Sequence, residues 1–278
     1  MQHPPRATHR HYLMCEPTYY TVCYEINPWM HPDQGTDTDL AVTQWRRLRD
    51  ALRDLGHTVE QIDPIPGLPD MVYAANGATV VDGICYPAKF RYPQRQPEGP
   101  AYQAWFAAHG YATGTARHVN EGEGDMLLVG RTLVAGSGFR SKRAAHAEAQ
   151  ELFGHPVISL RLVDPRFYHL DTALSVLSSA PDDPQIAYYP PAFSAGSRGV
   201  LRRLFPDAVI ADDEDAAALG LNIVSDGSHV VHAPGARRLA AQLRERGFQT
   251  IPVDTTELLK GGGGAKCCTL EIREAPAA

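Results

Sequence analysis

The chain of 278 residues has no long apolar run, no excess of basic residues and few cysteines. No stretch approaches the roughly 18 apolar residues that a membrane-spanning helix needs, so we expect no membrane partner. Lys and Arg number 26 against 32 Asp and Glu, giving a net charge of -6, whereas nucleic-acid-binding proteins usually carry a basic face. Residues 1–11 are polar and lack the apolar core of a secretory signal. We therefore expect a cytoplasmic protein that does not bind nucleic acid.

The cysteine content also limits the class of protein. There are five cysteines, an odd number that argues against a disulfide framework in a chain of this length. Apolar residues make up 44% and charged residues 21%, which are the proportions of a globular protein with a sizeable core. We predict one domain over residues 1–278, with residues 1–10 disordered. The sequence leaves the oligomeric state open, and a homo-oligomer is one option.

One pattern of elements recurs along the chain. In its clearest copy, residues 222–232 form two apolar strands around Asp226-Gly227, a sequence typical of a hairpin turn. A helix over residues 234–246 follows, a glycine ends it, and residues 248–253 form a third strand. The order is therefore strand, strand, helix, strand.

Four looser copies of this unit precede it. Their first strands or hairpins are expected at 12–15, 78–86, 126–135 and 173–189, and their helices at 39–55, 100–108, 142–153 and 198–205. Five ββαβ-like units with a period of about 45–60 residues predict a ring of modules, because one unit alone cannot cover its apolar face. The alternative is a doubly wound sheet, which fits less well because hairpins recur between the helices.

The C-terminal segment contains the most distinctive residue pattern. Four glycines at 261–264 lead to Cys267 and Cys268, just before a short apolar strand predicted at 269–272. Glycine leaves room for a ligand to approach the backbone, and a cysteine held in a cleft beside a base is a candidate nucleophile. Adjacent residues of an extended strand point to opposite sides, so one cysteine would face a cleft and the other the core. The alternative is a mobile glycine-rich tail that happens to contain cysteines.

Four polar clusters lie at the junctions of the predicted units. They are residues 25–30 with Asn27, 69–77 with Asp70 and Asn76, 120–125 with Glu121, Glu123 and Asp125, and 167–172 with His169 and Asp171. Each cluster alone has an ordinary explanation, such as a turn residue after proline or a solvated loop. Because the ends of successive modules can meet at the centre of a ring, the four clusters together predict one central polar site.

These motifs carry a resemblance to a known family. Pro69-Asp70, the run Glu-Gly-Glu-Gly-Asp at 121–125, residues 169–172 and the glycine-rich segment before Cys267 resemble the guanidine-modifying (amidinotransferase) superfamily. The resemblance implies a pentein fold, a five-bladed α/β-propeller of ββαβ units around a central active site. Hydrolytic members of the superfamily include dimethylarginine dimethylaminohydrolases, arginine deiminases and arginine dihydrolases.

The resemblance implies a role for each polar cluster. Cys267, the first cysteine, would attack the guanidinium carbon, and His169 would protonate the leaving amine and then activate water. Glu121 and Asp171 would hold the planar guanidinium cation, with Glu123 and Asp125 as neighbours. This chemistry requires no metal and no cofactor.

Substrate recognition would use a further set of residues. Arg140 is expected to bind the α-carboxylate of an amino acid, and Arg95 is either a second anchor or a surface arginine. Asn76 stands where many relatives carry an acid, so the guanidinium clamp has less negative charge. An asparagine there resembles the arginine dihydrolase branch. Asn27 and Asp70 complete the predicted substrate contacts, and residues 18–32 are a candidate lid.

The expected function is therefore hydrolysis of the guanidine C–N bond in a free methylarginine, giving citrulline and dimethylamine. The alternative is arginine as the substrate, with citrulline and ammonia or ornithine and two ammonia as products. Amidine transfer to an acceptor amine is a third option. A binding protein that keeps the ring fold without catalysis belongs to a different class, and the joint presence of Cys267, His169 and several carboxylates argues against it.

Overall fold

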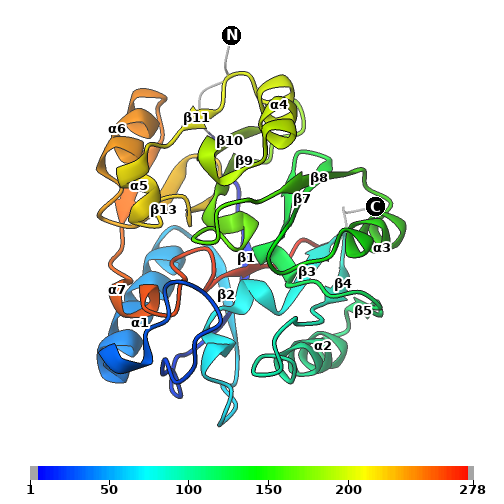
Figure 1. The fold of residues 1–278 in the computed structure, drawn as a ribbon, viewed down its shortest axis with the longest axis vertical. Coiled ribbons are helices and arrows are strands. Elements are labelled where there is room, and N and C mark those ends of the chain that lie inside the picture. Colours follow the sequence, from blue (N-terminus) through cyan, green and yellow to red (C-terminus); the bar gives the residue numbers. More distant parts are fainter. Residues whose placement is uncertain (1–5, 275–278) are drawn as a thin grey trace.

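The computed structural model describes residues 6–274, which form five sheets of three strands each around a common centre (Figure 1). In each sheet the first strand pairs antiparallel with the second, which pairs parallel with the third. A helix connects the second strand to the third in every unit. The predicted ring of five ββαβ units is therefore confirmed, and a doubly wound sheet is excluded.

Four of the units are continuous in sequence. The second unit contains β3 (Ala78–Val81), β4 (Ile84–Pro87), α2 (Glu98–Ala108) and β5 (Ala112–Thr113), and the third contains β6 (Met126–Val129), β7 (Thr132–Ser137), α3 (Arg143–Phe153) and β8 (Val157–Arg161). The fourth contains β9 (Leu174–Ser178), β10 (Gln185–Tyr188), α4 (Ala195–Leu204) and β11 (Val209–Ile210), and the fifth contains β12 (Val224–Ser225), β13 (His229–His232), α6 (Arg237–Glu245) and β14 (Gln249–Pro252). Two short helices, α5 (Asp213–Ala217) and α7 (Thr256–Leu259), lie between units.

The first unit joins the two ends of the chain. Its outer part is β1 (His11–Cys15), α1 (Thr38–Asp54) and β2 (Thr58–Ile62), and its inner strand is the C-terminal β15 (Leu270–Glu271). Tyr12 pairs with Glu271 and Leu13 with Leu270, so the ring is closed by β1 and β15, which lie side by side near the middle of Figure 1. Residues 6–10 were predicted to be disordered, but the structure places them against the fifth unit, where Thr8 N donates to Asp226 O. The rest of that prediction, residues 1–5, lies outside the described residues.

Local sequence explains the hairpins and the outer helices. The β3–β4 turn places Asp82 at φ 52° and Gly83 at φ 74°, which are the two left-handed positions that Asp-Gly supplies in a tight hairpin. Helix α1 begins after Asp37, whose side chain accepts from Leu40 N. Its buried face contains Ala41, Trp45, Leu48 and Leu52. The outer helices cover the apolar sides of the sheets and leave the inner strand ends for polar groups.

Short turns at the inner strands carry most of the polar residues predicted from sequence. The 3-10 turns Ala74–Asn76, Gly122–Gly124 and Leu170–Thr172 lead into β3, β6 and β9, and a turn at 265–268 leads into β15. The strand predicted at 269–272 covers only Leu270–Glu271. Cys267 and Cys268 lie in the turn before it and not in an extended strand, as the prediction of opposite-facing side chains had assumed. Within residues 6–274, no helix combines the length and apolar character of a membrane span.

Candidate active site

Cys267 lies at the centre of a buried polar cluster. Its Sγ is 3.3 Å from Asp171 Oδ2 and 3.1 Å from Asn222 Nδ2, and only 2% of the residue is exposed. Asn222 also holds the backbone of the turn, because its Oδ1 accepts from Cys267 N at 3.0 Å and from Gly264 N at 3.1 Å. Sequence analysis missed Asn222. The signal was its position two residues before β12, which matches that of Asn76 before β3.

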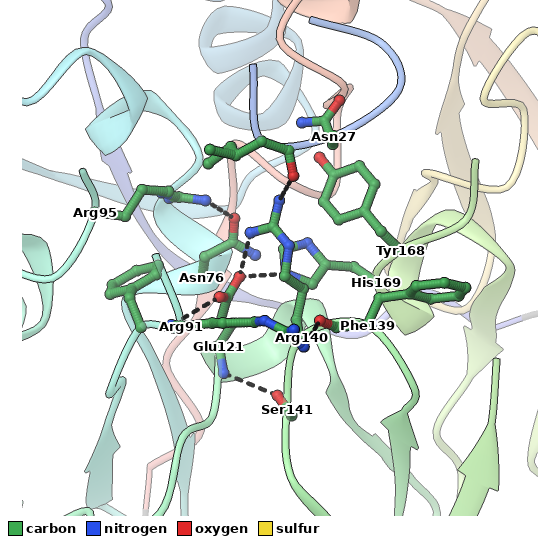
Figure 2. Close-up of polar contacts among 12 residues, drawn as sticks. Asn27, Asn76, Arg91, Arg95, Glu121, Phe139, Arg140, Ser141, Tyr168 and His169 are labelled. Atoms are coloured by element: carbon green, nitrogen blue, oxygen red, sulfur yellow. Dashed lines mark hydrogen bonds and ion pairs between the residues drawn. The ribbon is translucent and has the colours of Figure 1, made fainter. Parts of the chain in front are cut away.

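The glycine-rich segment is packed closely against two polar side chains. Gly262 has φ 89°, and a Cβ there would lie 2.8 Å from the Tyr168 hydroxyl and 2.9 Å from Asn27 Oδ1. Tyr168 donates to Gly262 O at 3.0 Å, and Asn27 Nδ2 donates to Gly261 O at 3.0 Å. Figure 2 shows Asn27 and Tyr168 next to each other on this side of the site. The segment is therefore an ordered wall of the cluster and not a mobile tail.

His169 is oriented by Glu121. The distance between His169 Nε2 and Glu121 Oε2 is 2.7 Å, and both side chains are fully buried (Figure 2). An ionised carboxylate only accepts, so Nε2 carries the proton and Nδ1, which has no partner, is left with its lone pair. Burial disfavours the ionised form of Glu121, but the Arg140 guanidinium and the hydrogen bond to His169 hold its pKa well below the usual range. The pair supplies a histidine of fixed tautomer.

Arg140 is held by two hydrogen bonds and by two aromatic rings. Its Nη1 donates to Glu121 Oε2 at 2.8 Å and its Nη2 donates to Ile26 O at 3.0 Å. Its guanidinium carbon lies 4.7 Å from the ring centroid of Tyr92 and 4.6 Å from that of Tyr168. Two aromatic faces therefore hold the plane of the guanidinium, beside the carboxylate that orients His169.

Arg95 is buried in a different set of contacts and is not a surface arginine, since only 3% of it is exposed. Its Nε and Nη2 donate to the two oxygens of Glu98 at 2.9 and 2.8 Å. Its Nη1 donates to Asn76 Oδ1 at 2.8 Å, and its Nη2 also reaches Asp70 O at 3.2 Å. These partners occupy Nε, Nη1 and Nη2 of the Arg95 guanidinium. The contacts therefore favour a role in positioning neighbouring side chains over the predicted role as an anchor for the substrate carboxylate.

Arg95 determines how Asn76 faces the site. Arginine has no acceptor, so the amide oxygen of Asn76 turns toward it and the Nδ2 group turns away without any partner. A Cβ at Gly124 would lie 2.3 Å from this Nδ2 and 3.3 Å from the His169 ring. Only glycine at 124 therefore lets Asn76 and His169 approach each other. Asp70 is buried behind them, and its Oδ2 accepts from the Tyr24 hydroxyl at 2.9 Å.

Glu123 and Asp125 were predicted to be neighbours of the acids that hold the guanidinium, and in the structure their oxygens accept from other protein groups. Glu123 accepts from Lys266 Nζ and from Glu271 N, each at 2.8 Å, and pairs with Arg273. Asp125 accepts from Ser141 N and Leu170 N, each at 3.1 Å. Their oxygens are used in holding backbone and basic side chains, so Glu121 and Asp171 are the acids of the central cluster.

The charges of Cys267 and Asp171 are linked. Burial raises the pKa of Asp171 to about 7. Burial and the nearby carboxylate of Asp171 raise the pKa of the Cys267 thiol well above its usual value. Among residues 6–274, seven buried polar side-chain atoms have no hydrogen-bond partner, and three of them are Asn76 Nδ2, His169 Nδ1 and Asp171 Oδ1. Unpaired buried polar groups are costly, so their concentration here marks a site prepared for a polar ligand.

Fold and site together define a guanidine-modifying enzyme of the pentein class. No family model matches the chain. It is 52% identical over 271 residues to a dimethylarginine dimethylaminohydrolase of Mycobacterium tuberculosis, covering 97% of this chain and 88% of that protein. It is 37% identical to the bifunctional arginine dihydrolase/ornithine cyclodeaminase ArgZ of Synechocystis, over 94% of this chain and 37% of ArgZ. The chain therefore belongs to the dimethylarginine dimethylaminohydrolase and arginine dihydrolase family, whose members hydrolyse C–N bonds of guanidino groups.

Solved structures agree with this assignment. The N-terminal domain of ArgZ bound to substrate, in a Cys-to-Ser variant, superposes with a TM-score of 0.90 at 35% identity, covering 95% of this chain and 98% of that domain. An Asn-to-Ser variant of the same domain was solved covalently bound to a reaction intermediate, also with a TM-score of 0.90. A dimethylarginine dimethylaminohydrolase adduct matches at 0.77 with 17% identity over 95% of this chain and all of that one, which shows the shared fold alone.

Proposed function

We propose that this chain hydrolyses a free methylated arginine, with citrulline and dimethylamine as products, through a covalent intermediate on Cys267. The observation that carries the proposal is the buried Cys267 thiol in contact with Asp171, with the unpaired Nδ1 of His169 two residues before Asp171 in the chain. The 52% identity to a dimethylarginine dimethylaminohydrolase supports the choice of substrate. The C–N hydrolase class follows from the family, whereas the substrate and the residue roles are our inference.

Binding of the substrate cation would neutralise buried charge near Cys267. Asp171 Oδ1 has no partner and would accept from the guanidinium of the substrate. A cation beside Cys267 favours the thiolate, which offsets the burial that raises the pKa of the thiol. Arg140 would bind the α-carboxylate with its remaining N–H groups, because Tyr92 and Tyr168 already hold its plane.

The chemistry would proceed in two steps. The Cys267 thiol gives its proton to His169 Nδ1 as its sulfur attacks the guanidinium carbon, and the C–N bond to dimethylamine breaks as His169 passes that proton to the leaving nitrogen. Water then attacks the S-alkylthiouronium carbon while His169 Nδ1 takes its proton, and the C–S bond breaks to release citrulline and the Cys267 thiolate, which takes that proton back from His169. The sum is dimethylarginine plus water giving citrulline plus dimethylamine. Glu121 would fix the tautomer of His169 and stabilise its protonated form.

One observation favours arginine dihydrolysis as a second candidate. The Asn76 amide directs an N–H donor into the cluster, whereas a carboxylate at this position would accept from a guanidinium. A donor suits the ureido oxygen of citrulline better than it suits a cation, and polarising that oxygen would prepare citrulline for a second hydrolysis to ornithine. The 37% identity to ArgZ agrees with this candidate.

Product analysis separates the two candidates. The purified protein is incubated with asymmetric dimethylarginine and with arginine in parallel, and citrulline, ornithine, dimethylamine and ammonia are quantified. Citrulline and dimethylamine formed in equal amounts support the leading proposal. Ornithine with two equivalents of ammonia from arginine establishes the second candidate instead. If neither substrate yields citrulline or ornithine, both proposals are wrong.

A further inference from the structure

The side-chain amide of Asn222 joins three parts of the site at the Cys267 sulfur. Its Oδ1 accepts from two backbone groups, Cys267 N at 3.0 Å and Gly264 N at 3.1 Å. Its Nδ2 donates to Asp171 O and to Cys267 Sγ, each at 3.1 Å. Asn222 is 2% exposed, and both the oxygen and the nitrogen of its amide have two partners. The chemistry proposed above does not use this residue.

The partners of this amide fix its orientation. Backbone N–H groups only donate, so the amide atom that faces Cys267 N and Gly264 N must be the oxygen. The carbonyl oxygen of Asp171 only accepts, so the atom that faces it must be Nδ2. A rotation of the amide by half a turn would place N–H groups against N–H groups and an oxygen against a carbonyl. The orientation that satisfies the surrounding backbone therefore directs an N–H donor at the sulfur.

The Cys267 sulfur contacts two side chains with opposite effects on its charge. The thiol donates to Asp171 Oδ2 at 3.3 Å. Burial and the Asp171 carboxylate raise the pKa of the thiol, so both disfavour the thiolate. The Asn222 N–H is an uncharged donor to the same sulfur, and a hydrogen bond to an ionised group is stronger than one to a neutral group. This contact therefore strengthens when the thiol loses its proton.

We propose that Asn222 is a further catalytic residue, whose amide nitrogen donates to the Cys267 thiolate before attack and again when the thiolate is released. An uncharged donor suits this position, because a lysine or arginine beside the sulfur would repel the guanidinium cation of the substrate. Both steps involve the thiolate, which forms the C–S bond in the first step and leaves when that bond breaks in the second. The inference rests on the proposed role of Cys267 as the nucleophile.

The test separates the donor to the sulfur from the acceptor that holds the turn. Asn222→Asp keeps an oxygen for Cys267 N and Gly264 N but replaces the Nδ2 donor by a second oxygen, whereas Asn222→Leu removes both functions at similar volume. All variants carry Cys268→Ser, so that peptide mass spectrometry follows alkylation of Cys267 alone by iodoacetamide at several pH values. Loss of the donor should raise the thiol pKa by about one to two pH units, and should slow alkylation of Asn222→Leu by about 3- to 15-fold. Asn222→Asp should react more slowly still, because a carboxylate oxygen then faces the sulfur.

Thr269→Val is the matched control for the turn. The Thr269 hydroxyl hydrogen-bonds to Ala265 O at 3.3 Å and to Lys266 O at 3.1 Å, so it holds the same turn through its backbone. The control should alkylate at the rate of the parent protein. If Thr269→Val is slowed as much as Asn222→Leu, the order of the turn explains the result and the proposal is overturned.

The rate of Asn222→Asp decides between the two roles of the amide. A rate equal to that of the parent protein overturns the proposal, because the oxygen alone would then account for Asn222, and this holds even if Asn222→Leu does not fold. In active protein, kcat/KM should fall in the same order as the alkylation rates, and an unchanged kcat/KM in the Asn222 variants would also overturn the proposal. Because alkylation needs no substrate, the expected order of rates without any product formation would refute the proposed function and leave the donor to the thiolate intact.

Discussion

Two buried polar clusters lie side by side in this fold, and they are built on opposite principles. The axial cluster, which we define as Arg10, Glu123, Lys266, Glu271 and Arg273, pairs its charges, and each of its carboxylates contacts two basic side chains. The catalytic cluster, which we define as Cys267, His169, Glu121, Asp171, Asn76 and Arg140, leaves three polar atoms without partners. In the axial cluster only Arg10 Nε is left unpaired among the described residues.

The difference indicates what each cluster contributes. Paired buried charges are expensive to separate, because removing one leaves its partner unsatisfied in a dry environment. Unpaired groups already carry that cost in the free protein, and a ligand would relieve it. Variants of the catalytic cluster should therefore lose activity with little loss of stability, whereas variants of the axial cluster should lose stability first.

The largest effect is expected at the nucleophile. Cys267→Ser should reduce kcat/KM by on the order of 10⁴-fold or more, because a hydroxyl is far less acidic than a thiol. Its melting temperature should stay within a few degrees of the wild-type value. Cys268→Ser is the matched control, since this neighbouring thiol is buried among apolar side chains, whereas the Cys267 thiol also contacts Asp171 and Asn222. Loss of activity on alkylation of Cys268, with Cys267 left unlabelled in mass spectra, would contradict the assignment.

His169→Gly should lose turnover but retain the first chemical step. Without the imidazole, attack by Cys267 on the substrate proceeds more readily than hydrolysis of the adduct, so a thiouronium adduct should accumulate. Intact-protein mass spectrometry after incubation with dimethylarginine or arginine measures this mass increase. Normal turnover of the variant would show that His169 is only structural.

The axial cluster gives the contrasting result. Arg273→Met removes one of the two basic partners of both Glu123 and Glu271, and removal of one member of a buried ion pair costs about 3–5 kcal/mol. The free energy of unfolding, measured by chemical denaturation, should fall by that amount. The folded protein should keep kcat/KM within about tenfold of wild type, since Arg273 is not in the catalytic cluster. A large loss of activity at unchanged stability would show that the two clusters do not divide these roles.

Much of the fold could be predicted because its signals are local. The hairpin turns Asp82-Gly83 and Asp226-Gly227, and the helices of all five units, follow from turn chemistry and from apolar spacing. The pairing of β1 with β15 is different, since it joins residues at opposite ends of the chain. No local pattern encodes that contact, although the five repeated units and the family resemblance both predicted a ring.

The site could be predicted at the level of motifs and less well at the level of contacts. Motifs predicted Cys267, His169, Glu121 and Asp171 in one site, and the structure pairs His169 with Glu121 and Cys267 with Asp171. In the run at 121–125, however, spacing could not tell which acid turns inward, because this depends on the turn that begins with Gly122 at φ 57°. The contacts of Arg95 involve Glu98 and also Asn76, which comes from another element. Asn222 holds the turn at 265–268 through Cys267 N, and this contact depends on where the turn lies in the fold.

Arg140 lies in the catalytic cluster but already forms an ion pair with Glu121, so it combines features of the two clusters. Arg140→Ala should cost about 2–5 kcal/mol in kcat/KM with arginine-type amino acids, the usual cost of removing one partner of a buried charge pair. The cost should be much smaller with agmatine, which lacks the α-carboxylate. The measurement is kcat/KM for both substrates in both proteins. An equal loss for the two would mean that Arg140 supports Glu121 and the fold rather than the substrate.

The smallest effect concerns stability against pH. The Asp171 pKa is raised to about 7, so between its unfolded value near 4 and pH 7 the folded protein retains a proton that the unfolded chain has released. This group therefore makes the fold less stable as pH rises through that window.

Asp171→Asn should abolish turnover. It should also flatten the dependence of the unfolding free energy on pH, reducing its slope between pH 5 and 7 by up to about 1.4 kcal/mol per pH unit. Denaturant titrations of both proteins at several pH values measure this slope. The same slope in the two proteins would mean that Asp171 is already ionised at pH 5, and the unpaired oxygen of the catalytic cluster would then carry a full negative charge before any substrate binds.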